Sequence, residues 1–227
     1  MTLQRGVLVV LSGIDCAGKS TQLDLLRQRA SEQGLSAETL WLRPGYSPWL
    51  DATRRVLRRV RPGALPTPGI ANNARRDAAF RRTDVRVAWV SVALADLWAQ
   101  YTLRLRGMLL RHDLVLCDRG LVDAKIDFTL RFPEMQPGWS TALRVVDASM
   151  PTPDAHVLLT IPREEMILRQ ARKSEPFPDP PDLRDRRYAL YSELKGARIH
   201  RVDTSVASIE ETNDRIWQLI ETSRALR

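Results

Sequence analysis

The chain has 227 residues, 44% of them hydrophobic, which suits one sizeable core and leaves little room for a second domain. We therefore expect a single domain over residues 1–227. The net charge of +8 is compatible with nucleic acid or with small polyanionic substrates, and two cysteines argue against a disulfide framework or a cysteine-based zinc site.

The first residues resemble a buried strand rather than a secretory leader. They lack the basic start, the long apolar stretch and the small-residue cleavage site of such a leader. Residues 6–12 read GVLVVLS, a β-branched and apolar run that is typical of a parallel strand covered on both faces. We expect a cytoplasmic protein whose first element is this strand.

A glycine-rich segment follows the strand. Residues 13–20 read GIDCAGKS, in which two glycines enclose four residues and a lysine and a hydroxyl residue follow. Backbone N–H groups of such a loop converge on phosphates, Lys19 adds a mobile charge, and Ser20 is placed to bind the Mg²⁺ that bridges the outer phosphates of ATP. The segment opens a predicted helix over residues 19–33, which argues against a chance match. Lys19 is a catalytic candidate, and the predicted ATP-binding residues here are Gly13, Asp15, Cys16, Ala17, Gly18, Lys19, Ser20 and Thr21.

The region after this helix contains a second strand and then little regular pattern. Residues 37–42 are a strand candidate, closed by a turn at residues 43–45. Residues 48–60 resemble a short arginine-bearing helix. Residues 62–82 are predicted to form a mobile loop or a weakly formed helix that substrate orders.

The longest periodic segment covers residues 84–111. It is apolar on more than one face, which predicts a helix at the centre of the fold or at a dimer interface. Charged and polar residues that a membrane span would not tolerate cheaply interrupt it: Arg86, Asp96, Gln100, Arg104 and Arg106. We therefore expect no membrane association.

A third strand, residues 113–117, ends directly before Asp118 and Arg119. Ligands of open α/β sheets bind beyond the carboxyl ends of the strands, so both side chains are candidates for the phosphate site. Asp118 is predicted to hold Mg²⁺ through water and to be catalytic, and Arg119 to bind a phosphate with two hydrogen bonds. A structural salt bridge is the alternative for both.

Two basic stretches flank a proline-rich acidic segment at residues 175–182. Arg163, Arg169 and Arg172 precede it, and Arg184, Arg186 and Arg187 follow it. Such an arrangement is typical of a lid that brings arginine over a transferring phosphoryl group, and we expect this lid at about residues 163–187. A solvated charged face is the alternative for any one of these arginines.

The remaining strands are residues 155–161 and 198–202, and the last helix covers residues 209–226. Strands and helices alternate throughout, which predicts an α/β protein of the P-loop NTPase type: a doubly wound, five-stranded parallel sheet with helices on both faces. His112, His156 and His200 show no spacing typical of a metal site or a triad, so we assign them no chemistry.

The order of these motifs resembles the thymidylate kinase family across the whole chain. The residues that carry the resemblance are the phosphate loop, Arg43-Pro44-Gly45, Ala95-Asp96, Cys117-Asp118-Arg119, Ile161-Pro162-Arg163 and Val202-Asp203-Thr204. The phosphate loop and Asp118-Arg119 are the highly specific ones. The resemblance implies Mg²⁺-dependent transfer of the ATP γ-phosphoryl group to a nucleoside monophosphate, in a homodimer that packs through long helices.

The resemblance also implies roles for individual residues. Asp15 matches a carboxylate that contacts the acceptor sugar, and Arg43 and Arg119 match arginines that hold the acceptor phosphate. Cys16 stands where some members carry an arginine, so the catalytic arginine is expected from the lid, at Arg169 or Arg172. The other implied contacts are Asp96 and Gln100 for the acceptor, Arg163 for ATP and Asp203 near the adenine.

The acceptor side departs from the family pattern. Leu97 stands where the family has an arginine, and residues 120–123 lack the usual tyrosine. A modified nucleotide, a nucleoside or a sugar phosphate therefore stays open as the acceptor. A nucleotide-binding protein without catalysis is another alternative. A nucleic-acid-binding protein is the last, because the arginines of residues 54–61 come with no nucleic-acid-binding motif.

Overall fold

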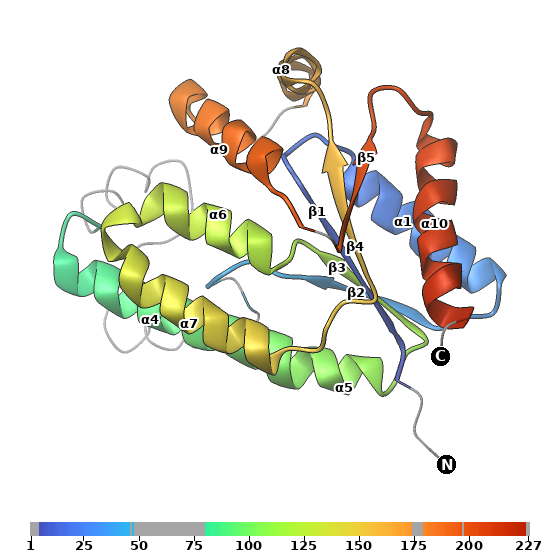
Figure 1. Cartoon of the computed structure of the whole chain (residues 1–227), viewed down its shortest axis with the longest axis horizontal. Helices are drawn as coiled ribbons and strands as arrows, with labels where there is room; N and C mark the ends of the chain where they lie inside the picture. The colour runs from blue at the N-terminus through green and yellow to red at the C-terminus, as the bar shows by residue number, and fades with distance from the viewer. Residues whose placement is uncertain (1–4, 46, 48–79, 174–178, 197, 226–227) are drawn as a thin grey trace, which may run out of the picture.

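The computed structural model of the chain describes residues 5–45, 47, 80–173, 179–196 and 198–225. Within these residues five parallel strands form one sheet in the order β2-β3-β1-β4-β5 (Figure 1). The predicted five-stranded parallel sheet is therefore confirmed. The strands are β1 (Val7–Gly13), β2 (Ala37–Trp41), β3 (Leu114–Asp118), β4 (Ala155–Thr160) and β5 (Ile199–Asp203).

Helices cover both faces of the sheet (Figure 1). On one face lie α1 (Lys19–Glu32) and α10 (Ile209–Ala225). On the other lie α4 (Thr83–Trp98), α5 (Leu105–Leu109), α6 (Leu121–Arg131) and α7 (Gln136–Ser149), with the short 3₁₀ turn η3 (Pro133–Met135) before α7. Helices α8 (Arg163–Arg172) and α9 (Pro181–Glu193) follow the carboxyl end of β4 and lie where the lid was predicted, so we call them the lid helices.

Strand β1 shows why its sequence is apolar throughout. Val7, Val9 and Leu11 belong to the hydrophobic core on one face of the sheet, and Leu8 and Val10 belong to the core on the other. Successive side chains of a strand point to opposite faces, so a strand between two helical layers needs apolar residues at every position.

The long helix predicted for residues 84–111 forms, but it is not uniform. It runs through α4, a π-helical segment η2 (Ala99–Arg104) and α5 without a break. Gln100 and Tyr101 of η2 are buried. Short π segments inside α-helices occur often at functional sites, and this one contains the predicted acceptor residue Gln100.

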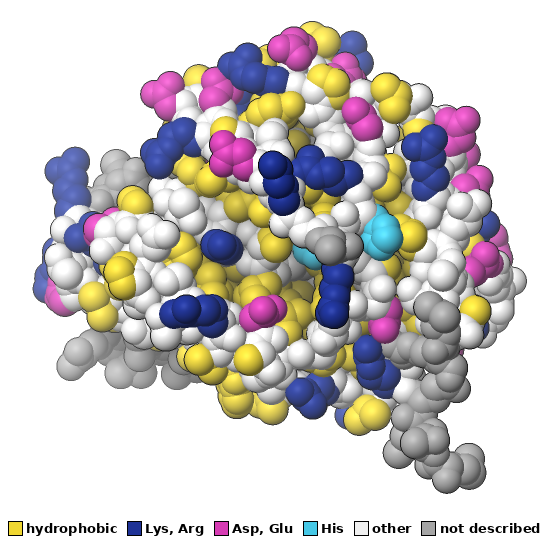
Figure 2. Space-filling view, in the orientation of Figure 1, with side chains coloured by type: hydrophobic (Ala, Val, Ile, Leu, Met, Phe, Trp, Pro, Cys, Tyr) yellow, Lys and Arg dark blue, Asp and Glu magenta, His cyan; other side chains and the backbone are white. Residues whose placement is uncertain are grey.

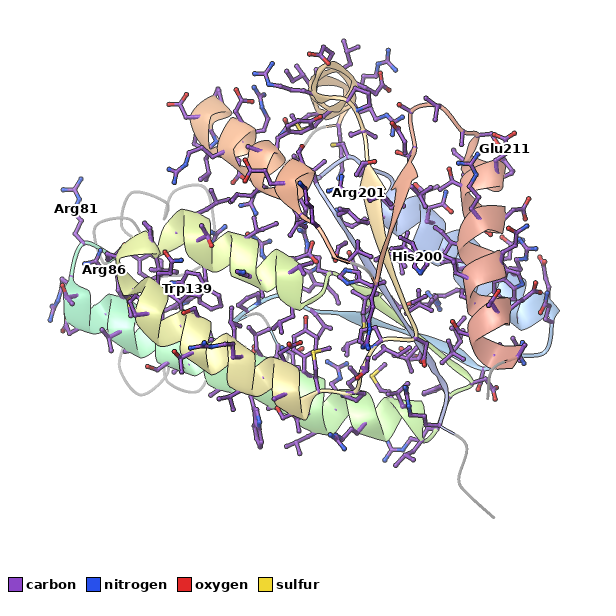
Figure 3. The ribbon with its side chains drawn as sticks, in the orientation of Figure 1. Arg81, Arg86, Trp139, His200, Arg201 and Glu211 are labelled. Atoms are coloured by element: carbon purple, nitrogen blue, oxygen red, sulfur yellow. The ribbon has the colours of Figure 1, made fainter. Side chains whose placement is uncertain are left out.

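Helix α9 is joined to the far edge of the sheet. Arg201 of β5 donates hydrogen bonds to the carbonyl oxygens of Ser192 and Leu194 at the end of α9 (Figure 3). These carbonyls lack partners within the helix, so an arginine there satisfies them.

Among the described residues, no helix combines the length and the apolar character needed to cross a membrane.

Three predictions lie wholly or partly outside the described residues. These are the short helix at residues 48–60, the loop at residues 62–82 except its last three residues, and the first half of the acidic segment, residues 175–178 of 175–182.

Candidate phosphate-binding site

The phosphate loop joins β1 to α1, as expected. Gly13 has a φ of +143°, and a Cβ there would lie 2.4 Å from the carbonyl oxygen of Leu159. Gly18, with φ of +89°, directly precedes α1. Cys16 also has a positive φ of +68°, which is uncommon for a side-chain-bearing residue and recurs at ligand sites. The chain thus forms a compact loop before a helix N-terminus, the arrangement that binds phosphate through main-chain N–H groups.

Lys19 is buried beneath this loop. Its Nζ donates hydrogen bonds to the carbonyl oxygens of Gly13 at 2.7 Å and Ile14 at 2.9 Å. Burial and the nearby Arg119 charge lower the pKa of Lys19, while three carboxylates, the strongest that of Asp15, act in the opposite direction. The ammonium group is therefore held by neutral acceptors, which an anionic phosphate oxygen can replace with a stronger hydrogen bond.

Ser20 and Asp118 are the two residues predicted to hold Mg²⁺. Ser20 is exposed in the first turn of α1, and Asp118 ends β3, the strand paired with β1. The Oδ1 atom of Asp118 is buried and has no hydrogen-bond partner within the described residues. Burial, helped by two neighbouring carboxylates, raises the pKa of Asp118, against the effect of Lys19 and Arg119. A carboxylate oxygen with no partner among the described residues suits Mg²⁺, which takes few protein ligands and completes its shell with phosphate and water.

Arg119 faces Asp15 across the site. It directly follows β3 with a φ of +75°, and its Nη2 donates to Asp15 Oδ1 at 2.5 Å. Burial disfavours the charged form of Asp15, but the positive charges of Arg119 and Lys19 outweigh it and lower the pKa of Asp15 to about 2. Two residues predicted to bind the acceptor therefore form an ion pair with each other.

The lid supplies one arginine to the phosphate loop. Arg169 of α8 donates to the carbonyl oxygen of Cys16 at 3.5 Å, and to the hydroxyl and carbonyl oxygens of Thr204 at 3.3 and 3.0 Å. Its Nε donates to Glu165 at 2.7 Å. Thr204 in turn donates to the carbonyl oxygen of Ala17 at 3.2 Å. The structure thus brings Arg169 to the loop that should carry ATP phosphates.

The other residues predicted on the donor side are Arg163, Arg172 and Asp203. Arg163 pairs with Asp185 of α9 at 2.6 Å, and Arg172 is exposed at the end of α8. Figure 2 shows basic and acidic side chains intermingled over α8 and α9. Asp203 accepts hydrogen bonds from the N–H and hydroxyl of Ser205 at 2.8 and 2.6 Å, next to the Thr204 contact with the loop.

The predicted acceptor residues Asp96 and Gln100 form a buried unit. Asp96 Oδ2 accepts from the Gly45 N–H at 3.2 Å and from Gln100 Nε2 at 3.1 Å, which ties the long helix to the turn after β2. Asp96 Oδ1 is buried and has no partner within the described part of the chain.

Arg43, from the same turn, lines a small apolar cavity of about 10 Å³, room for one water molecule. Aromatic rings form much of its wall: the Trp89 and Phe132 ring centroids are 5.2 Å apart, and those of Trp89 and Phe128 are 6.4 Å apart. The remaining lining residues are Pro44, Asp127 and Arg131.

A group of buried polar residues was not predicted. Ser12, Asp123, His156 and Tyr191 are joined by hydrogen bonds directly beneath the phosphate loop. His156 therefore takes part in a polar network, a role that no spacing of the histidines predicted. The position of Asp123, three residues after a helix-starting glycine, was the available signal, because a carboxylate there receives hydrogen bonds from the start of its helix.

Comparisons with known proteins give the same fold. No protein-family model and no curated protein sequence matches the chain. The solved structure of a thymidylate kinase from Candida albicans, described as having broad substrate specificity, is similar with a TM-score of 0.62 at 20% identity, over 97% of this chain and 93% of that one. A thymidylate kinase from Ehrlichia chaffeensis is similar with a TM-score of 0.55 at 16% identity, over 96% and 99%. The chain therefore has the thymidylate kinase fold, as its motifs predicted.

Proposed function

We propose that this chain transfers the γ-phosphoryl group of ATP to a nucleoside monophosphate. The single observation that carries the proposal is the convergence of the Lys19 loop, Asp118, the Asp15–Arg119 pair and the lid residue Arg169 at the carboxyl ends of β1 and β3. Phosphoryl transfer needs little covalent chemistry from the protein, so positioned charges of this kind can account for catalysis.

On the donor side, the main-chain N–H groups of residues 13–18 would hold the outer phosphates. Lys19 would exchange its two carbonyl acceptors for phosphate oxygens. Ser20 and Asp118 would hold Mg²⁺, which neutralises charge between the outer phosphates when it is bound. The adenine would lie near Asp203, whose neighbour Thr204 contacts the loop.

On the acceptor side, Arg119 would release Asp15 to bind the acceptor phosphate together with Arg43. Asp15 would then be available for a hydroxyl of the acceptor sugar. Asp96 and Gln100 would line the far end of this site. Of the two lid arginines, the contact with Cys16 favours Arg169 over Arg172 as the group that stabilises the transferring phosphoryl.

The test is ADP release from Mg²⁺-ATP across a panel of nucleoside monophosphates, nucleosides and sugar phosphates. We expect release that requires at least one monophosphate, with kcat reduced about 10³-fold in Lys19→Ala and unchanged in the exposed control Lys195→Ala. Turnover with sugar phosphates or nucleosides alone would show that the acceptor class is wrong. ATP binding without turnover on any acceptor would show that the chain is not a kinase.

We also propose that two copies pair through the long helix. Its exposed apolar side chains support this: Val87, Val92, Trp98 and Leu103 are 41–60% exposed, and Val145 of α7 is 59% exposed. Exposed apolar patches commonly mark protein interfaces. Light scattering at micromolar concentration should give twice the chain mass of 25.8 kDa, and a monomer would contradict the pairing.

A further inference from the structure

A buried carboxylate connects the phosphate loop to the lid. Asp123 of α6 is 1% exposed. Its Oδ2 accepts from the Ser12 hydroxyl at 2.5 Å and from the Gly120 N–H at 2.6 Å. Its Oδ1 accepts from the Tyr191 hydroxyl at 2.6 Å and lies 3.5 Å from the Gly13 nitrogen. One side chain therefore joins the end of β1, the turn after β3 and helix α9.

The hydrogen bond from the Gly120 N–H to Asp123 affects the orientation of Arg119. The turn is tight, because Arg119 has a positive φ and a Cβ on Gly120 would lie 2.6 Å from Val10 Cγ1. Asp123 holds the N–H of the peptide that follows Arg119 and so fixes the direction in which the arginine leaves the strand. Arg119 Nη1 is 3.9 Å from Asp123 Oδ1, while Nη2 is bound to Asp15. The guanidinium group thus lies between two carboxylates.

Helix α9 makes two polar contacts with α6, and one of them reaches the Asp123 carboxylate. Tyr191 binds Asp123, and Arg187 Nη1 binds Asp127 at 2.5 Å. The two residues of each helix are four apart, so both contacts lie on the facing surfaces of the two helices. Burial and the Asp123 charge raise the pKa of Tyr191, so its hydroxyl keeps the proton that it donates.

Ser12 extends the network to β4. Its Oγ is 2.8 Å from His156 Nε2, and because Ser12 gives its hydrogen to Asp123, we infer that His156 is the donor in this second bond. Hydrogen bonds from β1, from the start of α6 and from α9 therefore fix Asp123 together. Of the hydrogen-bond donors named here, Tyr191 is the one on a lid helix.

We propose that Asp123 is a positioning residue, which holds Arg119 in place for the acceptor and makes that placement depend on Tyr191 of the lid helix α9. The predicted effect on kinetics rests on the proposed phosphoryl transfer, whereas the predicted effect on the structure does not. Without the Tyr191 hydroxyl, Asp123 Oδ1 loses its short donor. The Gly13 N–H remains at 3.5 Å, and the charged donor next to this oxygen is Arg119 Nη1 at 3.9 Å. The arginine would move from Asp15 toward Asp123 and away from the acceptor.

The test compares Tyr191→Phe with Tyr188→Phe. Tyr188 lies one helical turn earlier on α9 and donates to the carbonyl oxygen of Ile161 at 3.2 Å, so its variant also removes one lid hydroxyl but leaves Asp123 untouched. We expect Tyr191→Phe to lower kcat/KM for the acceptor about tenfold, with the KM for ATP changed less than about twofold. Tyr188→Phe should leave both constants unchanged.

Hydrogen exchange provides a second measurement that needs no turnover. The Gly120 and Gly13 amides should exchange about tenfold faster in Tyr191→Phe than in Tyr188→Phe, because the carboxylate that faces them is less well held. Equal kinetics in the two variants, or equal exchange at these amides, would overturn the proposal. If the wild type has no kinase activity, the exchange experiment still decides, so failure of the proposed function is distinguishable. Asp123→Asn is the second variant, and it should accelerate the same amides at least as much.

Discussion

At the scale of single residues, Gly13 meets two constraints at once. Its φ of +143° is accessible to glycine and rarely to other residues, and a Cβ would be only 2.4 Å from a backbone oxygen of β4. Gly13→Ala should therefore lower the free energy of unfolding by about 3 kcal/mol. Gly107→Ala is the control. Gly107 lies in α5, no atom of the described residues is within 4 Å of a Cβ placed there, and the change should raise stability by about 0.5–1 kcal/mol. Urea denaturation measures both, and equal stability of the two variants would contradict this account of the loop.

His156 should make stability depend on pH. Burial lowers its pKa below the ordinary 6.5, so as pH falls the unfolded chain binds this proton first. The contribution of His156 is complete above about pH 6.5 and is lost progressively below it. His156→Gln keeps an Nε2 donor for Ser12 but does not titrate. Urea unfolding between about pH 7.5 and about pH 5 should show a smaller loss of stability in the variant. A loss equal to that of the wild type would contradict the predicted shift.

The residues of the phosphate loop were predictable because main-chain binding of phosphate imposes a fixed spacing of glycine, lysine and hydroxyl. The role of Asp123 was not predictable, although it is among the most buried charged residues. Its partners Ser12 and Tyr191 are 111 and 68 residues away, and His156, which bonds Ser12, is 144 residues from that serine. The folded sheet brings these residues together. Hydrogen-bond networks between distant segments leave no local pattern.

At the scale of elements, three strands end one residue later than predicted. Gly13, Asp118 and Asp203 are the last residues of β1, β3 and β5, and they still pair with Leu159, Leu11 and Thr160. Glycine and aspartate are depleted in strands, so the predicted strands ended one residue before each of these positions. Their pairing means that the site is built on the rigid ends of the sheet. Rigid support of this kind is what precise placement of catalytic groups requires.

The docking of α9 on α6 should depend on Arg187. This buried side chain binds Asp127 at 2.5 Å and Asp179 at 2.7 Å. Arg187→Met leaves both carboxylates without their partner and should lower the free energy of unfolding by about 3 kcal/mol. Arg186→Met, which removes an exposed arginine one residue away, should change it by less than about 0.5 kcal/mol.

A double variant separates the buried charge from the lost contact. Adding Asp127→Leu to Arg187→Met removes the carboxylate that would remain unpaired, so part of the lost stability should return. Urea denaturation of the wild type, Arg186→Met, Arg187→Met and the double variant checks this. If Arg187→Met were as stable as Arg186→Met, the ion pairs would not hold the lid helix.

At the scale of the whole molecule, the sheet places the proposed donor-side and acceptor-side groups together at the carboxyl ends of its strands. Alternating strands and helices were enough to predict this layout, because parallel strands covered on both faces leave ligands only the carboxyl ends. The identity of the proposed acceptor could not be predicted in this way. Discrimination between acceptors depends on a few polar groups, such as Asp96 Oδ1, which has no partner among the described residues and whose neighbours are set by the turn after β2 and the π segment together.

The central claim is that the first loop binds a triphosphate. Calorimetric titration with ATP, in Mg²⁺ and in chelator, tests it most directly. The affinity should be at least about tenfold higher with Mg²⁺, should be lost in Lys19→Ala, and should be retained in Lys195→Ala. A purified, folded protein with no Mg²⁺-dependent affinity for ATP or any other triphosphate would contradict the account.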